Sequence, residues 1–118
     1  MAATILVVDD ETEIRRIVSI LLKQEGYRAL EASNGSEALT VLGQETPDLV
    51  LLDIIMPGMD GFEVCQAIRE NPRTASVPVI MLSAVSNQVH DSTIKVDDYV
   101  PKPFKARDLL SRIEALVG

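Results

Sequence analysis

Five residues with chemically useful side chains stand where short apolar runs of the sequence end. They are Asp9, Asp10, Asp53, Ser83 and Lys102. Asp is disfavoured in strands, so its position directly after the apolar run Leu49–Leu52 is a local conflict. Such conflicts tend to mark functional positions. If the apolar runs are parallel strands of one sheet, three carboxylates, a hydroxyl and an amine meet at one edge.

Together these groups have the chemistry of phosphoryl transfer to an aspartate. Two bare carboxylates about 4 Å apart repel by roughly 4 kcal/mol at an effective dielectric constant near 20, so an acidic cluster favours a divalent cation. Hard oxygen ligands select Mg²⁺, which neutralises phosphoryl oxygens during in-line attack. Lys102 adds a positive charge for a phosphoryl oxygen, and Ser83 adds a hydroxyl donor. A carboxylate is then the nucleophile.

The elements that must position these residues follow from the pattern of apolar residues. Runs rich in Val, Ile and Leu without alternation predict strands buried on both faces. The predicted strands are Ile5–Val8, Arg28–Ala32, Leu49–Leu52, Val77–Leu82 and Tyr99–Val100. Apolar residues at helical spacing predict helices around Ile14–Leu22, Ala38–Leu42, Phe62–Ile68 and Leu109–Val117. The alternation of strand and helix predicts an α/β fold, a doubly wound five-stranded parallel sheet with helices on both faces.

Composition limits the class of function. The chain has 118 residues, which favours a single domain over residues 1–118. A net charge of −7, 3% aromatic residues and no Trp argue against nucleic-acid binding. No apolar run approaches the length of a membrane span, and no signal peptide is visible. A lone Cys65 makes no intrachain disulfide, so we expect a cytoplasmic module with no membrane contact.

The chain resembles the receiver domain of two-component response regulators over essentially its whole length. The resemblance rests on four segments that occur in order at the predicted strand ends: Val7–Glu11, Leu51–Gly61, Ser83–Ala84 and Asp97–Phe104. It implies a flavodoxin-like fold with strand order 2-1-3-4-5. It also implies a signalling domain, and not an enzyme, that accepts a phosphoryl group from a sensor histidine kinase or a histidine phosphotransfer protein.

The resemblance assigns a role to each of the three Asp residues at the predicted strand ends. Asp53 would be the phosphoacceptor. Asp10 and Asp53 would bind Mg²⁺ directly, together with the backbone carbonyl of Ile55, and Asp9 would act largely through water. The phosphorylated domain would then signal to an effector protein or domain, with phosphorylation-dependent dimerisation as one route.

The same resemblance implies a conformational switch. Lys102 would pair with Asp53 before phosphorylation and with the phosphoryl group afterwards. Ser83 would move to bond that group, and Tyr99 would change rotamer with it. No effector domain follows Gly118 in the sequence, so we expect either a stand-alone receiver or one taken from a longer protein.

Three other interpretations of the residues stay open. Asp9 and Asp10 are also the residue type that caps a helix. A Mg²⁺-dependent aspartyl-phosphate phosphohydrolase of the haloacid dehalogenase group would carry a second Asp two residues after its nucleophile, where this chain has Ile55. A flavodoxin-like FMN-binding module would need a first strand–helix loop rich in Ser, Thr and Gly, where this chain has Asp9, Asp10 and Glu11.

Two departures from the family pattern give further expectations. The apolar residues Ile55 and Val85 cannot hydrogen-bond an attacking water, so loss of the phosphoryl group should be slow. The stretch between Ser83 and Tyr99 is about one helical turn short for the family. It is also rich in Ser, Asn, Asp, Thr and β-branched residues, which are poor helix formers. The fourth helix, within Ser86–Val96, should therefore be shortened, irregular or replaced by a mobile loop.

Overall fold

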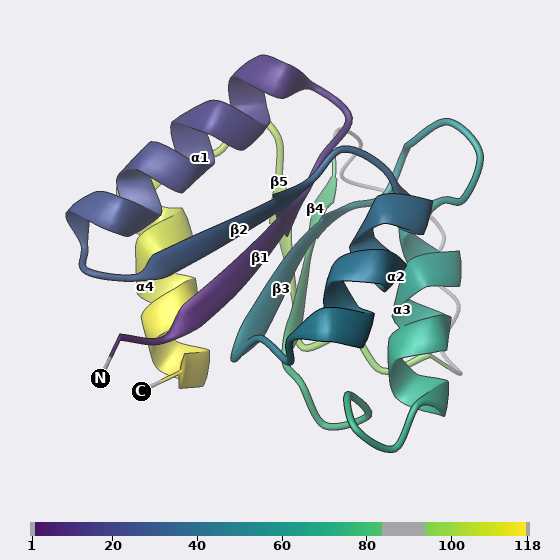
Figure 1. The fold of residues 1–118 in the computed structure, drawn as a ribbon. Coiled ribbons are helices and arrows are strands. Elements are labelled where there is room, and N and C mark those ends of the chain that lie inside the picture. The colour runs from purple at the N-terminus through teal and green to yellow at the C-terminus, as the bar shows by residue number, and fades with distance from the viewer. Residues whose placement is uncertain (1, 84–93, 118) are drawn as a thin grey trace.

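The computed structural model describes residues 2–83 and 94–117, which form one sheet with helices on both faces (Figure 1). The strands are β1 Thr4–Val8, β2 Arg28–Ala32, β3 Leu49–Asp53, β4 Val79–Ser83 and β5 Asp98–Pro101. The helices in the described residues are α1 Thr12–Gln24, α2 Gly35–Gln44, α3 Gly61–Glu70 and α4 Ala106–Val117. All strand pairs are parallel, in the order β2-β1-β3-β4-β5, which confirms the predicted α/β fold and strand order.

The helices divide the core into two apolar clusters, one on each face of the sheet. Helices α2 and α3 cover one face, and α1 and α4 cover the other (Figure 1). In β3, Val50 and Leu52 pack on the α2–α3 side, whereas Leu49 and Leu51 pack on the α1–α4 side. All four are fully buried, which explains why the run has no polar alternation.

Side-chain caps fix where two helices begin. The Asn34 side chain accepts a hydrogen bond from the backbone N–H of Glu37 at the start of α2. Asp60 and Glu63 form a reciprocal capping box at the start of α3, and α3 ends where Asn71 precedes Pro72. Helix α1 differs, because its N-cap residue Glu11 makes no side-chain capping bond.

One strand boundary differs from the sequence prediction by more than one residue. The run from Val77 becomes a strand only at Val79, because the Val77 amide donates to the Thr74 carbonyl in a turn. The other strand boundaries differ by at most one residue, and β3 ends at Asp53 itself.

The predicted irregularity of Ser86–Val96 falls mostly on residues outside the described part of the chain. Of that segment the structure describes only Ile94–Val96, whose backbone is not helical. The expectation of a shortened or irregular helix, or a mobile loop, between β4 and β5 therefore stays a prediction.

Candidate functional site

The carboxyl ends of four neighbouring strands bring the expected site residues to one edge of the sheet. Asp9 and Asp10 follow β1, Asp53 ends β3, and Lys102 follows β5. Ser83 ends β4 and pairs in register with Pro101 on β5. Its backbone is therefore at the same edge, but its side chain lies outside what the structure describes. Parallel α/β sheets bind ligands at this edge.

The Lys102 ammonium lies between buried carboxylates. Its Nζ is 2.9 Å from Asp9 Oδ2, 3.4 Å from Asp53 Oδ1 and 3.7 Å from Glu11 Oε1. Only 11% of the Lys102 side chain is exposed, and the Asp9 side chain is fully buried. The amine therefore partly compensates several negative charges at once. Sequence reasoning had not given Glu11 a place in this cluster, although its position beside Asp10 was the available signal.

Three carboxylates form a compact group with the donor set of a divalent-cation site. One oxygen from each of Asp9, Asp10 and Asp53 lies within 4.8 Å of the others. The two Asp9 oxygens already have partners, since Oδ1 accepts from the Glu11 backbone N–H at 2.9 Å and Oδ2 from Lys102. Asp10 is exposed to solvent, whereas Asp53 is buried. Hard oxygen donors that are partly open to water are the ligands that Mg²⁺ accepts.

Burial and neighbouring charge change the acidity of the site. Burial raises the pKa of Asp53 from 3.8 to about 6; the Asp9 and Asp10 charges act in the same direction and Lys102 acts against them. For Lys102, burial alone lowers the pKa, but its hydrogen bond to Asp9 and the charges of Asp53 and Asp9 outweigh burial, so the pKa is raised. The amine therefore stays protonated at neutral pH. A further cation at the carboxylates would favour the ionised, nucleophilic form of Asp53.

The first residue of α3, Gly61, lies in close contact with the backbone of Asp53. A Cβ at Gly61 would lie 2.5 Å from the Asp53 carbonyl oxygen, so only glycine allows α3 to begin this close to the site. The Gly61 N–H donates to the Ile54 carbonyl at 2.8 Å. Ile55, two residues after Asp53, is 56% exposed. Sequence reasoning did not single out Gly61, although a glycine at a helix start was the available signal.

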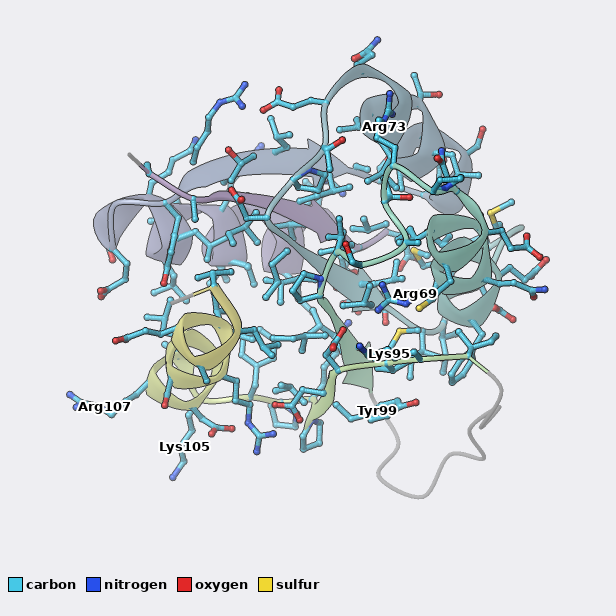
Figure 2. The ribbon with its side chains drawn as sticks, turned by 90° about the horizontal axis from the view of Figure 1, so that it is seen from below. Arg69, Arg73, Lys95, Tyr99, Lys105 and Arg107 are labelled. Atoms are coloured by element: carbon cyan, nitrogen blue, oxygen red, sulfur yellow. The ribbon has the colours of Figure 1, made fainter. Side chains whose placement is uncertain are left out.

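Tyr99 occupies a different environment from the carboxylate cluster. It lies on β5 and packs against the apolar cluster on the α2–α3 face. Its side chain points away from α4 (Figure 2). Burial, and then the nearby Cys65, raise the pKa of its hydroxyl.

The comparison with protein families agrees with this geometry. The model of the response regulator receiver domain matches residues 5–114. The chain belongs to the response regulator receiver domain family. A receiver domain is a phosphoacceptor signalling module and not an ordinary enzyme, so the family decides against the phosphohydrolase and FMN-binding alternatives.

Curated relatives of this receiver domain include two transcriptional regulators. It is 38% identical over 117 residues to the phosphate regulon transcriptional regulatory protein PhoB of Pseudomonas aeruginosa, covering 97% of this chain and 51% of that protein. It is 46% identical over 116 residues to the transcriptional regulatory protein ResD of Bacillus subtilis, covering 96% of this chain and 47% of that protein. The chain thus spans about half the length of the curated relatives it matches.

Solved structures of other receiver domains superpose closely. The chemotaxis response regulator CheY4 of Vibrio cholerae matches with a TM-score of 0.93 at 29% identity, covering 98% of this chain and 99% of that one. The receiver domain of the sensor histidine kinase PA1611 of Pseudomonas aeruginosa matches with a TM-score of 0.92 at 26% identity, covering 100% and 99%. In the described residues of this receiver domain, no helix has the length and apolar character to cross a membrane.

Proposed function

We propose that this receiver domain, acting as one unit over residues 1–118, accepts a phosphoryl group on Asp53. The donor would be a phosphohistidine of a sensor histidine kinase or of a histidine phosphotransfer protein. The supporting observation is the cluster in which buried Asp53 lies beside Asp9, Asp10 and the Lys102 amine. The single Cys65 and a kinase partner suit a cytoplasmic reaction.

In the proposed step, an oxygen of Asp53 attacks the phosphorus in line with the leaving imidazole nitrogen. The new O–P bond forms as the N–P bond breaks, and the imidazole nitrogen takes up a proton from solvent. Lys102, held between Asp9 and Asp53, keeps a positive charge next to the transferring oxygens. The step changes no oxidation state and needs no further reactant.

We assign the acidic cluster to Mg²⁺. Asp10, Asp53 and the backbone carbonyl of Ile55 would bind it directly, and Asp9, whose oxygens already have partners, would act through water. When bound, the cation neutralises charge on the phosphoryl oxygens. The receiver domain of PA1611 holds a magnesium ion in its active site cleft, which supports this assignment.

The proposed output begins at Ser83 and Tyr99. Ser83 ends the strand next to the one that carries Asp53, from which its hydroxyl would bond the phosphoryl group. Tyr99 would change rotamer with it. The similarity to PhoB and ResD supports a transcriptional output, through an effector domain or an effector protein. Dimerisation of the phosphorylated domain would be one way to transmit the switch.

Mass measurement after treatment with phosphoramidate tests the proposed function, because this donor has the N–P bond of a phosphohistidine. We expect one phosphoryl group on the wild-type protein with Mg²⁺, none with excess EDTA, and none on Asp53→Asn. Asp60→Asn is the matched control, since Asn also caps α3, and it should react like wild type. Full labelling of Asp53→Asn would overturn the assignment.

A further inference from the structure

Arg15, in the first turns of α1, links the acidic site to the neighbouring strand β2. Its Nη1 donates a hydrogen bond to the backbone carbonyl of Asp9 at 2.8 Å. Its Nε donates to Glu31 Oε1 on β2 at 3.1 Å. Only 15% of the Arg15 side chain is exposed. The guanidinium therefore bridges β2 and the turn that carries Asp9 and Asp10, which uses the rigid fork of donors that Lys lacks.

This bridge is one of the contacts that hold the turn between β1 and α1, where the usual device for fixing a helix start is absent. Glu11 makes no side-chain capping bond. The turn is held instead by the Asp9 carboxylate, which accepts from the Glu11 N–H, by the Asp9 N–H, which donates to the Ala32 carbonyl at 3.2 Å, and by Arg15. Arg15 is the only side chain among the described residues that bonds the Asp9 carbonyl.

Of the three carboxylates in the cluster, that of Asp10 depends most on the conformation of this turn. Asp10 is exposed, and none of residues 2–83 or 94–117 donates a hydrogen bond to its side chain. Its place within 4.8 Å of the Asp9 and Asp53 oxygens therefore depends on the backbone that carries it, with no hydrogen bond to its side chain to hold it there. The peptide that the Arg15 bond anchors is the one that joins Asp9 to Asp10.

We infer that Arg15 is a positioning residue for the divalent cation of this site, acting through the Asp9–Asp10 backbone with Glu31 as its anchor. The inference rests on the proposed function, since it concerns the same Mg²⁺ site. In this role Arg15 would touch neither the cation nor the phosphoryl group, because its side chain bonds the Asp9 carbonyl and Glu31. Partners that orient metal ligands typically change metal affinity by about 10- to 100-fold when they are removed.

Removing Arg15 has two opposite effects on Mg²⁺ binding, one through its charge and one through its positioning role. Loss of a positive charge near an acidic cluster strengthens binding of a cation, because repulsion falls. Loss of the bridge weakens binding, because Asp10 is no longer held in place. The neighbouring Arg16 is exposed, and its side chain makes no hydrogen bond or ion pair within the described residues. Arg16→Ala is therefore the matched control for charge alone.

The test is a Mg²⁺ titration of the folded proteins by NMR, which needs no phosphorylation. We expect Arg15→Ala to raise the Mg²⁺ dissociation constant about tenfold or more, and Arg16→Ala to leave it unchanged or slightly lower. Arg15→Gln keeps part of the side-chain packing and should weaken binding in the same direction, which covers the case that Arg15→Ala does not fold. If both Arg15 variants bind Mg²⁺ as tightly as Arg16→Ala does, the inference is overturned.

Phosphorylation kinetics separate this inference from the proposed function. With phosphoramidate, Arg15→Ala should need about tenfold more Mg²⁺ for half-maximal rate, while its rate at saturating Mg²⁺ stays near wild type. A purely structural defect would lower the saturating rate and leave the half-saturating concentration alone, which would count against positioning. Failure of the proposed function would instead appear as phosphorylation of Asp53→Asn, whatever Arg15→Ala does.

Discussion

Replacing Asp53 with Asn should stabilise the metal-free protein at neutral pH. The folded protein raises the pKa of this carboxyl from 3.8 to about 6, chiefly by burial and then by the charge of Asp9. The folded state therefore binds a proton more tightly than the unfolded chain does. Between these two values, stability falls as pH rises, because the folded state must give up a proton it prefers to hold.

The size of the effect follows from the same shift. A difference of about two pKa units corresponds to about 3 kcal/mol of lost stability once the pH is above 6. Asn carries no charge, so Asp53→Asn should be more stable than wild type by up to about 3 kcal/mol at pH 7.5. Near pH 3, where the carboxyl is protonated in both states, this contribution vanishes. Lys102 keeps its 2.9 Å contact with Asp9 in the variant.

Urea unfolding followed by circular dichroism, in EDTA and from pH 3 to 8, measures this difference. The gain from Asp53→Asn should grow between pH 4 and pH 6 and then level off. Glu70→Gln, at the exposed end of α3, makes the same chemical change outside the cluster and should show no such growth. A stability difference that is independent of pH, or a variant less stable than wild type at pH 7.5, would refute the reasoning.

Three further substitutions test neighbouring features. Ile55→Asn should speed loss of the phosphoryl group, followed as the decay of phosphorylated protein, because an amide can orient the attacking water; an unchanged rate would contradict this. Gly61→Ala should cost about 1–3 kcal/mol in urea unfolding, since its Cβ meets the Asp53 carbonyl; no loss would show that the contact relaxes freely. Ser19→Ala should gain about 1 kcal/mol, because the buried Ser19 hydroxyl has no partner in the described residues; a loss would reveal one.

The fold could be predicted from the sequence because its main signals are local. A run such as Leu49–Leu52 has no polar alternation only when both faces are covered, and the structure buries all four residues. The helix end predicted from Pro72 after Asn71, and the helix predicted from the apolar spacing of α1, also depend only on residues close together in the sequence. The strand from Val77 was placed two residues early, because apolar character does not distinguish a buried turn from a strand.

The core of the site was predictable for a similar reason, since polar residues at strand ends must meet at one edge of a parallel sheet. Asp9, Asp10, Asp53 and Lys102 do come together there. Arg15 was not predictable, because its reach to the Asp9 carbonyl and to Glu31 depends on how α1 lies against β2. The contact of Gly61 with the Asp53 backbone depends in the same way on tertiary packing.

The identity of the modified residue tests the central claim most directly. Borohydride reduces an aspartyl phosphate to homoserine, which marks the acceptor permanently. After phosphorylation with Mg²⁺ and reduction, peptide mass spectrometry should find homoserine at position 53. Its appearance at Asp9, Asp10 or any other aspartate, with position 53 unmodified, would contradict the account.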